Sequence, residues 1–396
     1  MQRRAFLKTL AALPALGVAG RLFAAPTSGP RFLLVFLRGG YDSNHLLVPY
    51  ASDFYYEARP HIAIARPGSG ADAATRLDDA WALAPAVHDS LGALYAQRQV
   101  AFVPFAGTDD LSRSHFETQD DVESGETAAQ RHGFHSGFMA RLAGVLGRQA
   151  APIAFTRSLP LSFQGGHGDI PNLSLRGRTR AAFTPRQVDL LQAMYEGTPL
   201  QAPVRDGLKL RQQVAGKFAE EMVHASRGAV NPGGFATETA RIATLMRDQF
   251  RLGFVDVGGW DTHVNQGDAR GVLANNLANL GRGLEAFARG MGDEWKHTVV
   301  AVISEFGRTF RENGDRGTDH GHGTVYTFLG GALRGGRILG EQRAVTRANL
   351  LQDRDYPVLN NYRAVFGGLF QRLWGLSDEH VNQVFPGAPP RDLGLV

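Results

Sequence analysis

RFLLVFL, residues 31–37, is an apolar run that no polar residue interrupts after Arg31. Short uninterrupted runs of this kind, rich in branched and aromatic side chains, are typical of strands that a sheet buries on both faces. Four further segments share this character: VAFVPF (100–105), GFVDV (253–257), TVVAVIS (298–304) and VYTFLG (325–330). Together the five segments predict the strands of one buried sheet.

Segments with helical periodicity alternate with these strands. The clearest covers residues 271–291, where leucine and other large apolar residues recur every three or four positions, and two others cover 186–197 and 361–375. Strands that alternate with helices are characteristic of a mostly parallel sheet covered on both sides. We therefore expect an α/β fold with a mostly parallel central sheet, helices on both faces, and a helical insertion or cap at about 160–250.

The first 25 residues have the composition of an export signal. Arg3 and Arg4 precede an apolar stretch at 9–18, and small residues follow around Ala24. A stretch this short, and this rich in alanine and glycine, does not span a membrane. The pattern predicts a twin-arginine signal peptide at 1–25 and export through the twin-arginine translocase, to the periplasm or the medium. The mature chain, 26–396, is then a single domain with no stable membrane span.

The charge balance gives no reason to expect a nucleic-acid partner. The full chain has 42 basic and 38 acidic residues, but the four basic residues of the leader account for the whole excess. A near-neutral mature chain lacks the electrostatic field that attracts a nucleic acid. Cysteine is absent, so oxygen and imidazole ligands must hold any metal, which excludes thiolate zinc sites and iron–sulfur clusters.

Polar groups follow the predicted strands at the points where functional residues of such sheets gather. They occupy residues 38–45, 107–125, 260–263 and 305–309, and a fifth group, TDHGHG at 318–323, precedes the last strand. Carboxylates, imidazoles and hydroxyls dominate all five. If the strand ends meet at one edge, these groups form a single acidic, imidazole-bearing pocket.

Three of the groups also have a simpler interpretation. Asp42 follows two glycines and is typical of a turn. Ser114 stands three residues before Glu117, which is the spacing of a helix-capping box. Asp261 and His263 point to the same side of an extended segment and can form an ordinary surface hydrogen bond.

The remaining two groups differ in how easily they are explained without a ligand. Glu305 comes at the end of a buried apolar strand, where a carboxylate is costly unless it is paired or bound to metal. For Arg308, a surface ion pair and the binding of an anionic ligand are equally consistent with the sequence. His320 and His322 are two residues apart, as are Asp261 and His263, and histidine is a common ligand of zinc and manganese. One of these two histidines is expected to be structural.

The order of these motifs resembles a known family. The motifs are VFLRGGYD (35–42), SRSHFETQDDVESG (112–125), GWDTH (259–263), SEFGRT (304–309), NGDRGTDHGHG (313–323) and DYPVLNNYRAVF (355–366). They resemble the secreted bacterial family called domain of unknown function 1501, over essentially the whole mature chain. That family is similar, more remotely, to the alkaline phosphatase and sulfatase superfamily, in which an α/β sheet holds two divalent metals beside a Ser or Thr nucleophile.

The resemblance implies roles for residues of this chain. The carboxylates and imidazoles of the motifs are the candidate metal ligands: Asp42, Asp261, His263, Glu305, Asp319, and His320 or His322. Ser114, or less closely Ser112, resembles the nucleophile. Arg113 or Arg308 would hold the ester oxygens through a planar fork of donors, and His115 would protonate the leaving group.

The resemblance also implies a function, with one departure. Phe306 stands where the superfamily has a metal-binding histidine, so the second metal lacks an expected ligand unless His115 or the second histidine of TDHGHG replaces it. We predict an exported hydrolase of a small anionic ester, phosphate or sulfate, with one or two divalent metals: zinc, manganese, magnesium or calcium. The alternative is a non-catalytic periplasmic binding or assembly protein that keeps the fold and part of the metal site.

Overall fold

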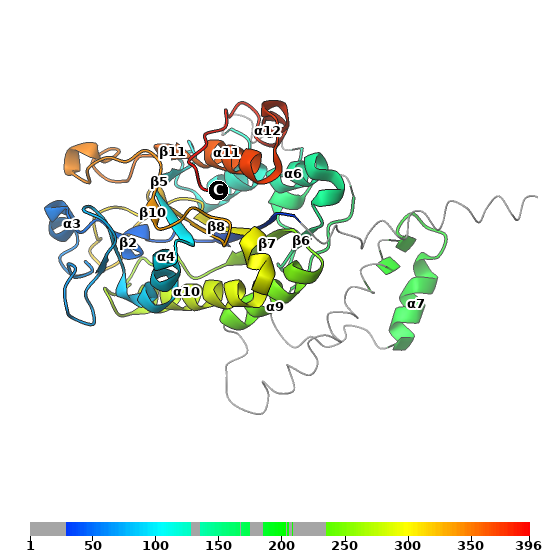
Figure 1. Ribbon diagram of the computed structural model, residues 1–396, viewed down its shortest axis with the longest axis horizontal. Helices are drawn as coiled ribbons and strands as arrows, with labels where there is room; N and C mark the ends of the chain where they lie inside the picture. Colours follow the sequence, from blue (N-terminus) through cyan, green and yellow to red (C-terminus); the bar gives the residue numbers. More distant parts are fainter. Residues whose placement is uncertain are drawn as a thin grey trace, which may run out of the picture.

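The computed structural model describes residues 29–127, 135–166, 168–174, 185–202, 204–205, 208 and 235–396. The predicted leader, 1–25, lies outside these residues, as does part of the predicted insertion. The described chain forms a central sheet between two layers of helices (Figure 1).

The central sheet confirms the predicted strands. Its members are β1 (Arg31–Leu37), β5 (Val100–Gly107), β6 (Pro152–Ala154), β7 (Leu252–Val257), β8 (Thr298–Ser304), β9 (Thr324–Leu329), β10 (Arg337–Ile338) and β11 (Asn360–Asn361). The order is β10-β5-β9-β8-β1-β7-β6, and β11 pairs with β5 off this path. Only β9 runs antiparallel to its neighbours β5 and β8. The sheet is therefore mostly parallel.

Alternate side chains of the central strand β1 enter two different cores. Leu33, Val35 and Leu37 belong to one apolar cluster, whereas Phe32, Leu34 and Phe36 belong to the other. Because successive side chains of a strand point to opposite faces, a strand buried on both sides must be apolar throughout. This requirement explains the uninterrupted sequence RFLLVFL.

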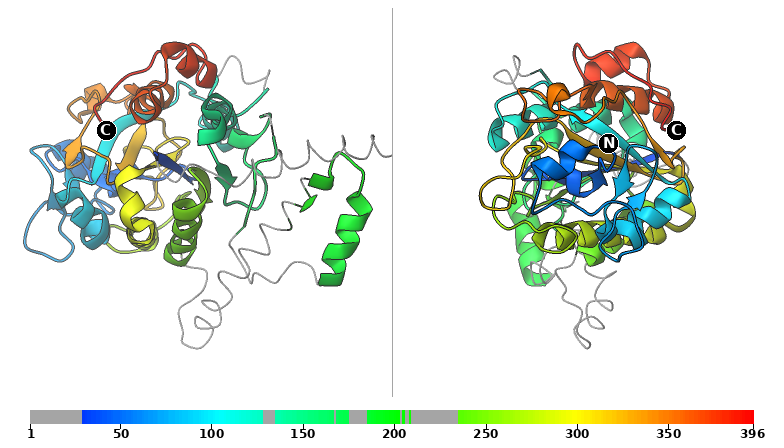
Figure 2. Two further views of the ribbon diagram at one scale, coloured as in Figure 1. Left: turned by 45° about the vertical axis from the view of Figure 1, so that its right-hand side comes forward. Right: turned by 90° about the vertical axis from the view of Figure 1, so that its left-hand side faces the viewer.

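Helices cover each face of the sheet, as expected. One layer contains α4 (Ala93–Ala96), α9 (Phe235–Asp248) and α10 (Val272–Met291), and the other contains α6 (Phe138–Leu146), α11 (Tyr362–Trp374) and α12 (Asp378–Val384). The views in Figure 2 keep these layers on opposite sides of the sheet. The α/β class with helices on both faces is confirmed.

Further α-helices and a small second sheet are also described. They are α3 (Asp53–Ala58), α5 (His115–Ser124), α7 (Pro185–Tyr195) and a sheet of β2 (Leu47–Val48), β3 (Thr75–Arg76) and β4 (Ala82–Leu83). Within the predicted insertion at 160–250, α9 packs on α10, while α7 lies to one side of the sheet in Figure 1. No helix of the described segments has both the length and the apolar character that crossing a membrane requires.

The sheet directions bring the polar groups to one edge. Strands β1, β5, β7 and β8 run the same way, so their carboxyl ends share that edge. Strand β9 runs the opposite way, so the residues before it, 318–323, return to the same edge. The five polar groups expected to meet therefore start from neighbouring positions.

Candidate metal centre

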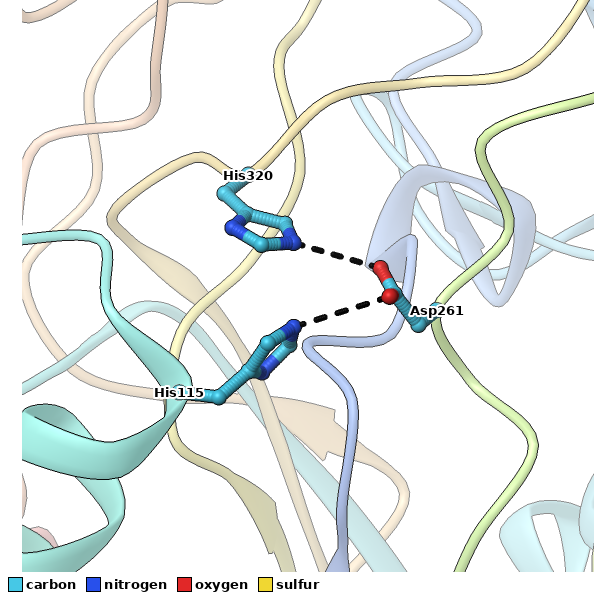
Figure 3. A group of neighbouring side chains, drawn as sticks. All are labelled: His115, Asp261 and His320. Carbon is cyan, nitrogen blue, oxygen red and sulfur yellow. Dashed lines mark hydrogen bonds and ion pairs between the residues drawn. The ribbon is translucent and has the colours of Figure 1, made fainter.

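Three side chains from separate loops face one another at this edge (Figure 3). His115 is the first residue of α5, Asp261 follows β7, and His320 precedes β9. One ligand atom from each lies within 4.8 Å of the others. The Nε2 atom of His320 is 3.2 Å from Asp261 Oδ1, and that of His115 is 3.7 Å from Oδ2.

Both imidazoles are oriented through their other nitrogen. His115 Nδ1 donates to the Glu305 carboxylate at 2.8 Å, and His320 Nδ1 donates to the Arg113 carbonyl at 3.1 Å. When Nδ1 carries the proton of a neutral imidazole, the lone pair is on Nε2. Both lone pairs then face the oxygens of Asp261.

This arrangement fits a cation. His115 Nε2 is buried and has no hydrogen-bond partner within the described part of the chain. Two imidazoles with one carboxylate are a common ligand set for zinc and related metals. Arg308, at 2.7 Å from Asp261 Oδ1, already balances part of the carboxylate charge. Hydrogen bonds from the far nitrogens of metal-binding histidines to a carboxylate or carbonyl are typical of such sites.

The two histidines differ in their pKa. The hydrogen bond to Glu305 is the main reason why the pKa of His115 is raised. Burial lowers the pKa of His320, and the nearby His115 and Arg308 lower it further. The lowered pKa favours the neutral form of His320, whereas the raised pKa favours a proton on Nε2 of His115, which a bound metal would have to displace.

Glu305 contacts the centre through the Nδ1 atom of His115. Its side chain is fully buried, and its Oε1 accepts from His115, from the Gly39 amide at 2.8 Å and from Gln119 at 2.9 Å. Burial raises the pKa of this carboxyl, but these hydrogen bonds outweigh burial and the pKa is lowered. Glu305 was predicted to bind metal directly, whereas the structure places it behind His115 as an orienting group.

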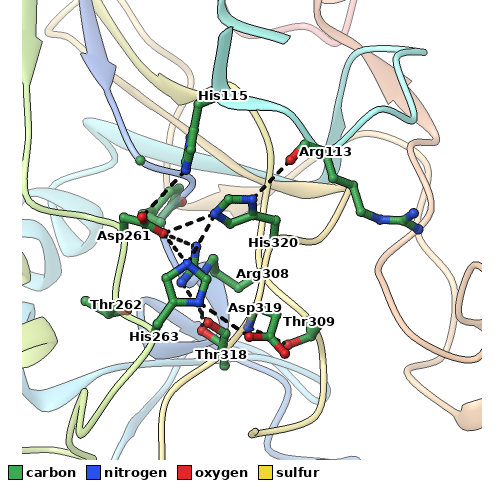
Figure 4. A network of polar contacts seen from close by, with 12 residues as sticks. Arg113, His115, Asp261, Thr262, His263, Arg308, Thr309, Thr318, Asp319 and His320 are labelled. Carbon is green, nitrogen blue, oxygen red and sulfur yellow. Dashed lines mark hydrogen bonds and ion pairs between the residues drawn. The ribbon is translucent and has the colours of Figure 1, made fainter. Parts of the chain in front are cut away.

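Asp261 is held by more than the two imidazoles (Figure 4). Arg308, with a fully buried side chain, donates to Asp261 Oδ1 at 2.7 Å and to the Thr318 carbonyl at 2.7 Å. His263 lies on the other side, with Nε2 2.9 Å from Asp261 Oδ1. Its Nδ1 is 3.4 Å from Asp319 Oδ1. The structure thus brings Asp261, His263, Arg308, Asp319 and His320 together, and Arg308 is a buried partner rather than a surface ion pair.

Glycines allow these loops to approach so closely. A Cβ on Gly39, at φ 123°, would lie 2.8 Å from the Asp261 amide nitrogen. A Cβ on Gly321 would lie 2.5 Å from the Arg308 backbone. Real side chains do not tolerate such contacts, so the glycines that flank the histidines of TDHGHG serve close packing of the backbone.

Asp42 is not brought into this group. Its carboxylate is 0% exposed and both oxygens accept from Arg59, at 2.5 and 3.0 Å, with Gln266 donating to Oδ2 at 2.7 Å. Burial opposes ionisation, but Arg59 and His45 hold the pKa of Asp42 well below its usual range. The prediction that Asp42 binds metal has no support from this geometry, because a buried guanidinium already occupies both oxygens.

Two further predicted site residues point elsewhere. His322 is 6% exposed, and burial together with the neighbouring Arg113 lowers its pKa to about 4. The Arg113 side chain bonds Asp355 at 2.8 Å and Gln352 at 2.8 Å rather than the centre. Arg113 contributes its carbonyl instead, from a left-handed backbone with φ 54°. Of the two histidines in TDHGHG, His320 faces the centre.

The serines behave as the capping interpretation expected. Ser114 is the N-cap of α5 and accepts from the Glu117 amide at 3.5 Å. Ser112 donates to Asp110 at 2.8 Å and accepts from the Ser114 amide at 3.3 Å. Ser114 is nevertheless adjacent in sequence to His115, so it lies at the margin of the centre.

Phe306 packs against the two metal-facing rings. It is 2% exposed, and its ring centroid is 4.9 Å from that of His115 and 5.1 Å from that of His320. A phenyl ring, which offers no metal ligand, therefore lies against both imidazoles. Among the described residues, the only cluster with metal-ligand spacing is that of His115, Asp261 and His320.

Some groups that hold the site residues in place belong to no recognisable motif in the sequence. Arg59, in the unremarkable segment EARP, saturates Asp42, and Gln266 links Asp42 to Thr318 at 3.0 Å. The Arg113 carbonyl is a backbone group that no residue type reveals. The sequence gives His115 two possible roles, as a proton donor and as a replacement for the imidazole missing at Phe306. Its place beside Asp261 and His320 fits the second role.

Comparison with known families places the chain. The family model described as "Protein of unknown function (DUF1501)" matches residues 30–385. The chain belongs to this family. The resemblance expected from the sequence motifs is thus confirmed, and the family spans both helical layers and every loop of the centre. No curated protein matches the chain.

Solved structures give distant matches to this DUF1501 chain. One is a crystal structure of Ps i-CgsB in complex with k-i-k-neocarrahexaose, with 8% identity, a TM-score of 0.41, and coverage of 91% of this chain and 75% of that one. Another is the soluble domain of lipooligosaccharide phosphoethanolamine transferase A from Neisseria meningitidis, with 8% identity, a TM-score of 0.36, and coverage of 78% and 79%. Because both TM-scores are below 0.5, neither structure indicates what this chain binds or does.

Proposed function

We propose that the chain is a metal-dependent hydrolase of a phosphate or sulfate ester. The observation that carries the proposal is the convergence of two Nε2 lone pairs, from His115 and His320, on the carboxylate of Asp261. Three ligands from three loops leave further coordination positions open, as metal sites that act on a substrate require. The side of Asp261 away from the sheet is accessible, with 45% of the side chain exposed.

His115, Asp261 and His320 would hold the ion. Imidazole ligands favour zinc or manganese over magnesium and calcium, which prefer oxygen. A divalent cation supplies Lewis-acid stabilisation of the negative charge that develops on the ester oxygens. Glu305 and the Arg113 carbonyl keep both rings aligned, so the ligands need no rearrangement when an ion binds.

Arg308 would stabilise the negative charge of the ester, and His263 would protonate its leaving alcohol. The buried guanidinium of Arg308 bonds Asp261 and adds positive charge beside the position of the anion. His263 has 40% of its side chain exposed and both ring nitrogens near carboxylates, Asp261 and Asp319. The imidazolium form of His263 can donate to both, and we assign it the role of giving a proton to the departing alcohol.

Ser114 is the proposed nucleophile. Its position at the N-terminus of α5 favours a negatively charged group, because the first amides of a helix are unpaired. Its Oγ would form the bond to phosphorus or sulfur while the bond to the alcohol oxygen breaks. The serine proton passes through water to His263 once the alcohol has left. A second water then attacks phosphorus or sulfur as the bond to Ser114 breaks; its hydroxyl stays with the released phosphate or sulfate and its proton restores the serine hydroxyl.

The second candidate function is binding without turnover. It is favoured by the cap hydrogen bond, which engages the Ser114 hydroxyl, and by Phe306, which leaves a single metal cluster in the described segments. In either case we propose that the protein acts in the periplasm or outside the cell, after export by the twin-arginine translocase. The basis is the leader composition at residues 1–25.

The test is to purify the full chain without chelator, measure its metal content, and assay aryl phosphate, phosphodiester and aryl sulfate esters. We expect about one divalent cation per chain, lost in His320→Ala and kept in the matched variant His322→Ala. Turnover should disappear in Ser114→Ala and persist in Ser112→Ala. Bound metal without turnover of any ester supports the binding function, and a chain that takes up no divalent metal overturns both.

A further inference from the structure

Several exposed apolar side chains belong to the segments that carry the residues of the metal centre. In the described segments, the large apolar residues with high exposure are Leu111, Phe116, Leu190, Met194, Leu200, Val264 and Val272. Leu111 and Phe116 flank His115 in sequence, and Val264 directly follows His263. Val272 is the first residue of α10, and the other three, Leu190, Met194 and Leu200, belong to α7 or the turn after it. Single exposed apolar residues are ordinary, but several around one polar site indicate a surface that contacts something apolar.

Two of these residues line a cavity that opens from the centre. The cavity has a volume of about 400 Å³ and is lined by Asp261 and His263 at one end and by Val264 and Val272 with Gly259 and Thr262. Val264 is 58% exposed and Val272 is 55% exposed. A molecule whose anionic end meets the centre therefore has an apolar wall beside its organic end.

The arginine that lines the cavity, Arg38, is already paired with carboxylates. Arg38 donates to Asp256 at 2.8 Å, to Gln119 at 2.8 Å and to Glu123 at 2.8 Å. Two carboxylates thus balance one guanidinium, and all three of its nitrogens have acceptors. Arg38 gives the cavity no excess positive charge for a second anionic group, so its apolar wall is the distinctive feature.

We propose that this cavity binds the organic part of the ester, and that this part is apolar, an aryl or alkyl group rather than a second charged or strongly polar one. The proposal rests on the proposed function, because the centre must first hold the anionic end. Val264 and Val272 are then specificity-determining residues, since they remove apolar surface of the substrate from water.

Binding of phosphonates, which are not hydrolysed, tests this without relying on turnover. Methyl-, butyl- and octylphosphonate are titrated by calorimetry into the zinc-loaded full chain. Affinity should rise by up to about fourfold for each methylene that is buried, with a progressively more negative heat capacity change. In Val264→Thr/Val272→Thr, which keeps side-chain shape at exposed positions, octylphosphonate should bind about tenfold more weakly. Methylphosphonate should be affected less than twofold.

The control is Leu190→Thr, which removes an apolar side chain 60% exposed on α7 and should change neither affinity. Equal binding of methyl- and octylphosphonate, or an unchanged octyl affinity in the double variant, overturns the proposal while the proposed function stands. Tighter binding of phosphorylated sugars than of octylphosphonate also overturns it, in favour of a polar substrate. If no phosphonate binds and no ester is turned over, the proposed function fails and this inference fails with it.

Discussion

Asp42 and Asp261 have similar positions in the sequence and opposite environments in the fold. Both follow strands of the same sheet at the same edge, and both were predicted metal ligands. Asp42 is 0% exposed, with both oxygens bound to Arg59. Asp261 has 45% of its side chain exposed and contacts the imidazoles of His263 and His320. The neighbours of each carboxylate, not its residue type or strand position, decide its role.

The physical reason is the cost of taking a carboxylate out of water. At full burial this cost is offset only by an opposite charge with good hydrogen-bond geometry, which Arg59 supplies to Asp42. A metal ion would have to displace that guanidinium. Asp261 also bonds a buried guanidinium, that of Arg308, through Oδ1, but it remains in contact with water, so its partners can include an exchangeable ion. The buried pair still supports the centre, because Gln266 joins Asp42 to Thr318, and Thr318 bonds Arg308.

The largest effect should come from Asp42→Asn. It leaves the Arg59 charge buried without its counter-charge, so the free energy of unfolding should fall by about 3–5 kcal/mol. Urea denaturation measures this. The matched control is Asp256→Asn, whose carboxylate is 34% exposed in its pair with Arg38 and should cost about 1 kcal/mol or less. Metal content of the folded Asp42→Asn protein should be unchanged; loss of metal with normal stability would reverse the roles assigned to the two aspartates.

Low pH should remove the contribution of the Asp42–Arg59 pair to the free energy of unfolding. The folded pKa of Asp42 lies well below the unfolded value near 3.8, so its contribution is complete above that value. It is lost as the pH falls from there through the lower folded pKa, where the unfolded state binds the extra proton. Denaturation midpoints between pH 5 and pH 2 should therefore fall more steeply for the wild type than for Asp42→Asn. Parallel curves would contradict the assignment.

Asp261→Asn should affect the metal more than the fold. Loss of a partner behind a ligand costs about 10–100-fold in metal affinity, so loss of a direct ligand should cost at least about 100-fold. Without metal, the free energy of unfolding should fall by about 1–3 kcal/mol, because the variant also leaves the buried Arg308 without its carboxylate, although Asp261 itself is half-exposed. Competition with a chelator measures the affinity. Asp319→Asn is the matched control, since Asp319 contacts His263 but lies outside the three-residue cluster, and an equal loss in that variant would redraw the ligand set.

Glu305→Gln tests positioning. It should weaken metal binding by about tenfold, because the amide holds the His115 proton less firmly than the carboxylate. The pKa of His115, raised by its hydrogen bond to Glu305, should fall, which NMR titration of the metal-free protein measures. Glu123→Gln, at another buried carboxylate, is the control and should leave His115 unchanged. A stability loss without a shift of the His115 pKa would indicate a purely structural Glu305.

The smallest expected effect separates the two roles of Ser114. Alanine removes the cap and should cost about 1 kcal/mol in unfolding, whereas asparagine caps a helix about as well as serine. Ser114→Asn should therefore retain stability and metal but lose ester turnover if the hydroxyl is the nucleophile. Full turnover in Ser114→Asn would assign Ser114 to capping alone.

The sequence could predict the architecture because burial on both faces leaves a direct trace. Strands β1 and β8 must be apolar throughout to be covered by two helical layers, and both were located to the residue. The positions of these apolar strands also predicted that the polar loops lie at one edge of the sheet. Residues such as Asp261, Glu305 and His320 could therefore be grouped before any contact was known.

Only the tertiary structure decided which of those loop residues face the metal centre and which bond other side chains. Whether Asp42 meets Arg59 or a metal, whether His320 or His322 turns inward, and whether Glu305 binds an ion or His115 all depend on groups distant in sequence. Such partners are brought together by loop conformations, including the left-handed backbone of Arg113 and the close approach at Gly39. Apolar periodicity reports which face of an element is buried, whereas it carries no information about which polar group a loop will meet.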